Sequence, residues 1–296
     1  MISIEALVVA IESLRGTPIR RHDERTVKDA LLPILSAYRP VSHSPHQSSI
    51  WWRARKCEGN KRFENLHDLI YPPADKVTFG RANLPNKPAM YASWNTATAV
   101  AEVAAQPGDL IQVIGIRRQR LKPFSSLLIG EMQSVYNSGG SIVNSRDIER
   151  NLAQLIRSQS DESNLVQLYC DSFFSDLFRR ETRRPQEYLP TAAYADFVYG
   201  SGLGLTYASV ESAHAMNIAM SANTFSTNFE VLFTMTLRVE NYFGFGVYKL
   251  SPSPLHFNFA KDGSILWDSV RAVHFEHSLS SGIQVDPAYD GWQLPL

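Results

Sequence analysis

Residues 79–105 read Phe-Gly-Arg-Ala-Asn-Leu-Pro-Asn-Lys-Pro-Ala-Met-Tyr-Ala-Ser-Trp-Asn-Thr-Ala-Thr-Ala-Val-Ala-Glu-Val-Ala-Ala. Gly80, Pro85 and Pro88 interrupt both the helix and the strand pattern, so we expect a loop over residues 80–88. The apolar run over residues 89–92 predicts a short strand. Asn95 then offers a side-chain oxygen as a cap, and residues 97–105 predict a helix because nearly all are strong helix formers.

Four side chains in this stretch have functional chemistry, namely Arg81, Asn83, Tyr91 and Glu102. Arg81 lies in the loop, and a planar guanidinium matches the oxygens of a phosphate group. Glu102 is the lone carboxylate of the Ala-rich helix, which suits the stabilisation of a cation. On pattern alone, Glu102 could equally be an ordinary exposed helix residue and Arg81 an ordinary solvated arginine. These residues therefore do not establish a function by themselves.

Bulk composition narrows the class of protein. The chain has 296 residues, 44% of them hydrophobic, which is enough for one large or two small domains. The 29 basic and 29 acidic residues balance, which removes the electrostatic argument for direct binding of nucleic acid or a membrane surface. The two cysteines give neither a disulfide framework nor zinc spacing. Because we find no signal peptide and no apolar run of about 18 residues, we expect a soluble cytoplasmic protein.

Periodicity and turn signals organise the rest of the chain as α+β, without regular βαβ alternation. Two helices, over residues 3–15 and from residue 23, predict an N-terminal helical hairpin (1–48). A second domain is expected over 49–296, with a helical insertion at about 124–187. Helices are expected from residue 146, over 165–179 and over 192–199. Strands are expected over 50–56, 110–116, 205–209 and 218–222, and strand signal extends over 229–250 and 265–275.

Other motifs point away from some chemistries. Two histidine pairs have three-residue spacing, but neither lies on a clear helix with a nearby carboxylate, so we predict no metal site. These pairs are His43/His46 and His274/His277. The glycine-rich residues 200–204 follow a helix rather than a strand, which is the wrong context for a dinucleotide fingerprint. Ser209 lacks a Gly-x-Ser-x-Gly elbow and is better interpreted as a hydrogen-bond donor to a ligand.

Two ordered blocks resemble the RES-domain family, which is named for an arginine, a glutamate and a serine. The first is Gly80-Arg-Ala-Asn-Leu-Pro, Ala-Met-Tyr-Ala-Ser and Thr-Ala-Thr-Ala-Val-Ala-Glu-Val. The second runs from Tyr188-Leu-Pro-Thr191 through Gly204-Leu-Thr-Tyr-Ala-Ser-Val to Asn217-Ile-Ala-Met. The resemblance covers about residues 50–120 and 186–222. The sequence departs from the family pattern at Ala82, because RES loops often read Gly-Gly-Arg-Trp-Asn. The smaller side chain puts the detailed packing of the loop in question, but not the match of the arginine.

The resemblance implies a core similar to that of ADP-ribosyltransferase toxins, with two small facing β-sheets, a cleft between them and flanking helices. It implies an NAD+ glycohydrolase or phosphorylase that acts as a bacterial toxin, with NAD+ as its substrate and no separate cofactor. The usual partner is an Xre-like antitoxin, and the apolar stripes of the N-terminal hairpin are compatible with a homo-oligomer. The alternatives are an ADP-ribosyltransferase that modifies a protein, and a non-catalytic binding module.

By the same resemblance, the catalytic positions are Glu102, Arg81 and Ser209. The NAD+-binding positions are Arg53, Arg81, Asn83, Tyr91, Ser209 and Asn217. The choice between Arg53 and Arg55 stays open, because both point the same way from one strand. We expect the arginines to hold the pyrophosphate and Tyr91 to flank the nicotinamide or its ribose. Glu102 would then stabilise the oxocarbenium-like ribose, with Ser209 holding the ribose or the glutamate.

Overall fold

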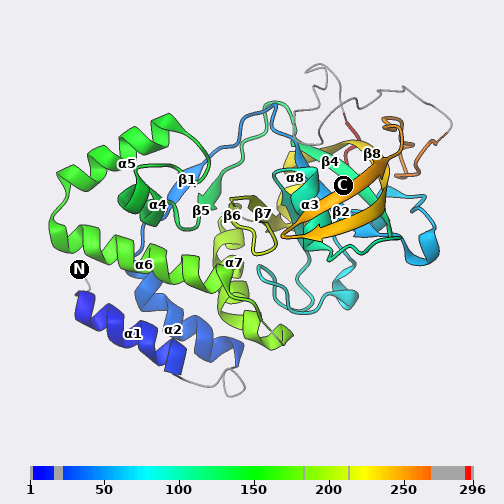
Figure 1. Cartoon of the computed structure of the whole chain (residues 1–296). Helices are drawn as coiled ribbons and strands as arrows, with labels where there is room; N and C mark the ends of the chain where they lie inside the picture. Colours follow the sequence, from blue (N-terminus) through cyan, green and yellow to red (C-terminus); the bar gives the residue numbers. More distant parts are fainter. Residues whose placement is uncertain (1–2, 17–22, 183, 213, 268–290, 295–296) are drawn as a thin grey trace. The chain divides into compact units, whose positions relative to one another are not determined.

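The computed structural model describes residues 3–16, 23–182, 184–212, 214–267 and 291–294. Its chain forms two compact units, each assembled from segments that are far apart in the sequence (Figure 1). The first unit comprises Met1–His43, Ala74–Lys87 and Ser125–Ala208. The second comprises Ser44–Pro73, Pro88–Phe124 and Ser209–Leu296.

The first unit is mainly helical. Its helices are α1 (Ile4–Gly16), α2 (Glu24–Ala37), α4 (Glu131–Ser138), α5 (Arg146–Ser158), α6 (Asp161–Arg179) and α7 (Leu189–Gly200). The sequence prediction of α1, α2, α5, α6 and α7 is confirmed. Asp23 caps α2 by accepting a hydrogen bond from the backbone N–H of Thr26 at 2.7 Å, as its position before the helix indicates.

Three short strands also belong to this unit: β1 (Val41–His43), β5 (Ser126–Leu128) and β6 (Gly204–Ala208). Strand β1 pairs antiparallel with β5, and β5 pairs parallel with β6. The first strand expected from the sequence was that over residues 50–56, so β1 was missed. Three residues with no alternation give no strand signal, and only the pairing with β5 defines the strand.

A buried carboxylate links the helices of the first unit. Asp171 on α6 accepts hydrogen bonds from the backbone N–H groups of Gly130 at 3.0 Å and Gln133 at 2.9 Å, at the start of α4. It also accepts one from the hydroxyl of Tyr38, which follows α2. Burial raises the pKa of Asp171, and these hydrogen bonds oppose that shift.

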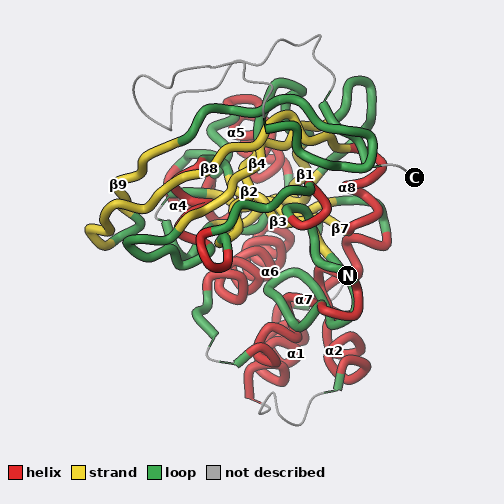
Figure 2. The backbone as a smooth tube through the Cα atoms, turned by 90° about the vertical axis from the view of Figure 1, so that its right-hand side faces the viewer, coloured by secondary structure: helices red, strands yellow, loops and turns green. Residues whose placement is uncertain are grey.

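The second unit is built on one open sheet. Its strands are β2 (Trp51–Lys56), β3 (Ala89–Ser93), β4 (Leu110–Arg118), β7 (Met216–Ser221), β8 (Phe229–Gly244) and β9 (Val247–Pro252). They lie side by side in the order β7-β3-β2-β4-β8-β9 (Figure 2). The prediction of strands over 50–56, 89–92, 110–116 and 229–250 is confirmed. Of the strand signal over 265–275, residues 268–275 lie outside the described residues, as do His274 and His277.

The expected pair of small facing sheets is wrong for this unit. Trp52 of β2 pairs with Ser93 of β3 on one side and with Gly115 of β4 on the other, and this double pairing joins all six strands into one sheet. The β2–β3 link is narrow, because Trp52↔Ser93 is its one registered pair. Gly115 is needed at this point, since a Cβ there would lie 2.3 Å from the ring of Phe233.

Each face of the sheet packs against a different helix. Helix α3 (Thr96–Glu102) places Ala99 and Val100 in a cluster with Trp52. On the opposite face, α8 (Ala222–Asn228) contributes Phe225 to a cluster that contains Trp51. Because adjacent residues of a strand point to opposite faces, Trp51 and Trp52 enter different hydrophobic clusters.

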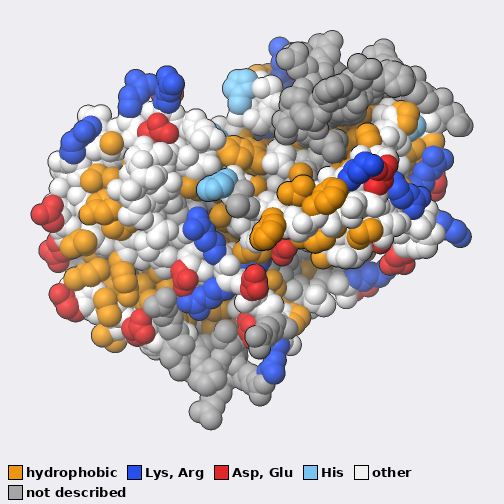
Figure 3. Space-filling model, in the orientation of Figure 1, with side chains coloured by type: hydrophobic (Ala, Val, Ile, Leu, Met, Phe, Trp, Pro, Cys, Tyr) orange, Lys and Arg blue, Asp and Glu red, His pale blue; other side chains and the backbone are white. Residues whose placement is uncertain are grey.

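Two boundaries differ from the predictions around the candidate residues. The helix expected to reach residue 105 ends at Glu102, because Ala104 adopts a left-handed φ of 48° and Pro107 follows. The strand expected over 218–222 begins earlier, at Met216, so that β7 includes Asn217, which pairs with Ser93. Among the helices that the structure describes, none is long and apolar enough to cross a membrane. Basic and acidic side chains are interspersed on the face drawn in Figure 3.

Candidate active site

Glu102 is the last residue of α3, and its carboxylate is bound on one side. Its Oε1 accepts a hydrogen bond from the Ser209 hydroxyl at 2.6 Å and another from the Asn217 amide Nδ2 at 2.6 Å. Among the described residues, no partner contacts Oε2. The side chain is exposed, so one oxygen is fixed by two donors while the other is open to a ligand.

Ser209 is held so that its proton points at Glu102. Its Oγ accepts hydrogen bonds from the backbone N–H groups of Glu211 at 3.1 Å and Ser212 at 3.2 Å. Its own backbone N–H donates to the carbonyl oxygen of Ala215 at 2.8 Å. Because a hydroxyl has one proton and two lone pairs, these contacts use all of them. The geometry supports a donor to the carboxylate rather than a nucleophile.

Asn217 reaches Glu102 from the start of β7, where it is the second residue of the strand. Its register partner Ser93 projects from the same face of the sheet and donates its hydroxyl to Oδ1 of Asn217 at 2.7 Å. Both side chains are buried, with exposed fractions of 5% for Asn217 and 4% for Ser93. The sequence analysis did not single out Ser93. The predicted strand ended at residue 92, one residue before Ser93, whereas β3 extends to Ser93 and places it on the same face as Tyr91.

Tyr91 lies on the same face as Ser93, two residues along β3. It pairs with Ala219 of β7, and its side chain is half-buried. The structure therefore places Tyr91, Ser93 and Asn217 on the sheet face that α3 covers.

Arg53 starts from the opposite face of β2, and its guanidinium is bound by main-chain oxygens. Nε donates to the carbonyl oxygens of Leu69 at 2.9 Å and Ile70 at 3.1 Å, and Nη1 donates to that of Tyr91 at 3.1 Å. Among the described residues, no carboxylate forms an ion pair with it, and no hydrogen bond joins it to Glu102. Burial, with the nearby charge of Arg55, lowers the pKa of Arg53 to about 10. A desolvated cation without a counterion favours the binding of an anion.

The surroundings of Arg55 differ from those of Arg53, and this difference bears on which of the two arginines is the candidate substrate-binding residue. Its Nη1 donates to the carbonyl oxygen of Asp68, and its guanidinium lies 5.1 Å from the centre of the Phe63 ring. Of these two arginines, only Arg53 has a hydrogen bond to the strand that carries Tyr91, which favours Arg53, and its place in a substrate site stays a prediction.

Arg81 and Asn83 belong to the first unit. They lie in a tight turn in which the backbone N–H of Gly80 donates to the carbonyl oxygen of Asn83 at 3.1 Å. Asn83 is buried, and its Nδ2 donates to the carbonyl oxygen of Thr78 at 2.8 Å. Ala82 is fully buried, so this turn packs around a methyl group. Whether Arg81 and Asn83 share a ligand with Glu102 stays a prediction.

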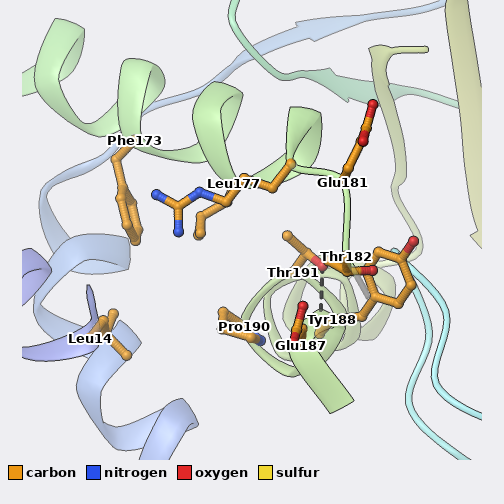
Figure 4. Close-up of a pocket in the computed structure, with 10 residues that line it drawn as sticks. Leu14, Phe173, Leu177, Glu181, Thr182, Glu187, Tyr188, Pro190 and Thr191 are labelled. Atoms are coloured by element: carbon orange, nitrogen blue, oxygen red, sulfur yellow. Dashed lines mark hydrogen bonds between the residues drawn. The ribbon is translucent and has the colours of Figure 1, made fainter. Parts of the chain in front are cut away.

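The Arg81 guanidinium is held by main-chain oxygens and an aromatic ring. Nη1 donates to the carbonyl oxygens of Phe178 at 2.6 Å and Arg180 at 2.9 Å, and the guanidinium lies 5.1 Å from the centre of the Tyr188 ring. Tyr188 also lines a pocket of about 140 Å³ within this unit, together with Thr191, whose Oγ1 donates to the carbonyl oxygen of Tyr188 (Figure 4). Among the described residues, no carboxylate forms an ion pair with Arg81, so it too is a cation suited to an anion.

Comparison with models of known protein families shows which family the chain belongs to. A family model described as the RES domain matches residues 50–234, which is more than half of the chain. The chain belongs to the RES domain family. The match contains every candidate residue named above and also spans residues 124–187. A search of the curated proteins and a search of the solved structures each found no match. The similarity of this RES domain to ADP-ribosyltransferase toxins stays a prediction.

Metal ligands do not gather in the described part of this RES domain. Within residues 3–16, 23–182, 184–212, 214–267 and 291–294, no group of three or more histidine, cysteine, aspartate or glutamate side chains is placed to hold a metal ion. The described site offers a carboxylate, a hydroxyl, an amide and guanidinium groups.

Proposed function

We propose that this RES-domain protein cleaves the bond between nicotinamide and ribose in NAD+, and transfers the ADP-ribosyl group to water or phosphate. One observation carries the proposal: Glu102 has one oxygen fixed by Ser209 and Asn217, and its second oxygen has no partner in the described chain. A carboxylate fixed in this way is preorganised to stabilise positive charge, which is how the largest catalytic effects commonly arise.

The reaction needs few groups, and the site offers them. The C–N bond breaks with its electron pair moving to the positively charged nicotinamide ring, which leaves neutral and needs no proton. The ribose carbon becomes oxocarbenium-like, and the open oxygen of Glu102 stabilises that charge. Water then forms the new C–O bond and gives up a proton, for which the same carboxylate is a suitable acceptor. With phosphate as the nucleophile, the product is the ADP-ribosyl phosphate.

The remaining residues bind the substrate in this proposal. Arg53 and Arg81 each lack a carboxylate counterion among the described residues, and a guanidinium binds pyrophosphate through paired charge-assisted hydrogen bonds. Tyr91 flanks the nicotinamide or its ribose, because its half-buried ring lies on the same sheet face as Asn217. Asn83 supports the turn that carries Arg81.

The biological setting is part of the proposal and follows from the family. We propose a cytoplasmic toxin that depletes NAD+ in a bacterium and is held in check by an Xre-like antitoxin protein. The apolar stripes of α1 and α2 are compatible with a homo-oligomer, whose state native mass spectrometry would measure.

Purified protein incubated with NAD+ tests the proposal. Free nicotinamide should accumulate with wild type, and adding phosphate should reveal the acceptor by the appearance of an ADP-ribosyl phosphate. Label transferred from NAD+ to a protein band in lysate would instead indicate an ADP-ribosyltransferase. If wild type consumes no NAD+ under any of these conditions, the proposed activity is wrong and a binding module remains.

A further inference from the structure

A buried pair of polar side chains lies behind the candidate carboxylate. Ser93 and Asn217 are register partners on β3 and β7, so the sheet fixes the separation of their backbones. The neighbouring ladder contact, from the backbone N–H of Trp94 to the carbonyl oxygen of Met216, is 3.0 Å long. This part of the site is therefore set by a rigid sheet, whereas Ser209 is set by a loop.

The orientation of the Asn217 amide matters to Glu102. With Nδ2 toward Glu102, a donor faces the carboxylate at 2.6 Å. If the amide were reversed, Oδ1 would face Oε1, and two acceptors would repel each other. An ionised Glu102 therefore selects the observed orientation, which leaves the amide oxygen needing a donor at its buried end.

Ser93 supplies that donor. Its hydroxyl donates to Oδ1 at 2.7 Å, and with only 4% of the side chain exposed it is not replaced by bulk water. A hydrogen bond accepted by the amide oxygen polarises the amide and strengthens its N–H as a donor. Ser93 thus acts on Glu102 through Asn217, across a directed chain of two hydrogen bonds.

We propose that Ser93 is a positioning residue of the active site, which locks the Asn217 amide and thereby holds the Glu102 carboxylate in its reactive orientation. Ser93 itself touches no reacting atom. The proposal rests on the proposed function for its kinetic consequence, but its structural consequence, the locked amide, does not depend on any activity.

Three variants of Ser93 separate the hydroxyl from its volume. S93A removes the donor, S93C replaces the hydroxyl by a larger thiol that is only a weak donor, and S93T keeps the hydroxyl on a residue that strands favour. We expect S93A and S93C to lower kcat for NAD+ about five- to tenfold, as the loss of one neutral hydrogen bond implies, with KM changed less than twofold. S93T should recover most of kcat.

Thr234→Val is the matched control. Thr234 is also a fully buried hydroxyl of this sheet; it donates to the carbonyl oxygen of Val113 at 3.0 Å and accepts from the Gln112 amide at 3.2 Å, and neither partner contacts Glu102. T234V should lower thermal stability at least as much as S93A and leave kcat unchanged. If S93A and S93C lose stability as T234V does while kcat stays at the wild-type value, the positioning role is refuted.

A spectroscopic readout keeps the two proposals apart. In protein labelled with ¹⁵N-asparagine, the side-chain amide peaks of Asn217 are identified by their loss in N217D. We expect S93A to shift and broaden these peaks, and T234V to leave them in place. Unchanged peaks in S93A overturn the positioning role. Absence of NADase activity in wild type, with shifted peaks in S93A, overturns the proposed function alone.

Discussion

Replacing Glu102 by glutamine tests the central residue with little disturbance of the fold. The amide oxygen of the new side chain can occupy the place of Oε1 and accept the same hydrogen bonds from Ser209 and Asn217. The amide nitrogen then takes the place of the open oxygen. The substitution therefore keeps the shape and removes the negative charge.

The expected effects of E102Q on folding stability and on reaction rate can be estimated separately. Hydrogen bonds to an ionised acceptor are about twice as strong as neutral ones, and Glu102 is exposed, so we expect a loss of folding stability of at most about 1 kcal/mol. Removing a preorganised electrostatic group from a reaction centre typically lowers the rate about a hundred- to a thousandfold. That range corresponds to about 2.7–4 kcal/mol of transition-state stabilisation.

The assay is nicotinamide release from NAD+ by wild type and E102Q, with circular dichroism to compare melting temperatures. Glu58→Gln is the matched control, because Glu58 is an exposed glutamate of the same unit and lies outside the candidate site. A folded E102Q that releases nicotinamide as fast as wild type would remove Glu102 from the mechanism. A fall in rate matched by E58Q would show that the effect is not specific to this carboxylate.

Three further outcomes follow from the same contacts. S209A should lower kcat about ten- to thirtyfold, because it removes one of two donors to a charged acceptor, and the double variant with E102Q should be no slower than E102Q alone in the same nicotinamide assay. R53K keeps the charge but loses the planar fork, so calorimetry with NAD+ should show binding weakened about tenfold, and equal affinity would exclude Arg53 from the site. The raised pKa of buried Asp171 means that the folded first unit binds a proton more tightly than the unfolded chain does. Its contribution to stability is therefore fully present below the unfolded-state pKa and is lost as the pH rises through the folded-state value. Urea titrations from pH 4 upward should show the free energy of unfolding of wild type falling relative to D171N, with a slope of up to about 1.4 kcal/mol per pH unit, and parallel curves would contradict this assignment.

Local structure was predictable where local chemistry sets it. Asp23 and Asn95 stand where two helices were expected to begin, and each accepts a backbone hydrogen bond as the N-terminal cap of its helix. The strand predicted over residues 50–56 is present as β2, which carries Arg53 and Arg55. The end of α3 was not predictable from propensity, because the left-handed turn at Ala104 overrides three residues that favour helix.

The candidate site was predictable only as a set of residue types. Glu102 lies 107 residues before Ser209 and 115 before Asn217, and no local pattern states that they meet. The family resemblance identified these residues as candidates, and only the structure shows that they contact one another. Ser93 could not be identified from the sequence, because its proposed role depends on its pairing with Asn217 on a neighbouring strand. The single sheet of the second unit was missed for the same reason, because strand order is a long-range property.

The interleaving of the two units also sets the order in which a ribosome can complete them. The last segment of the first unit ends at Ala208, and the next residue begins the segment that carries both donors to Glu102. A nascent chain can therefore finish its helical half while the carboxylate, made long before, still lacks the groups that orient it. If the proposed activity is correct, a nascent chain shorter than 217 residues therefore lacks part of the arrangement that orients Glu102.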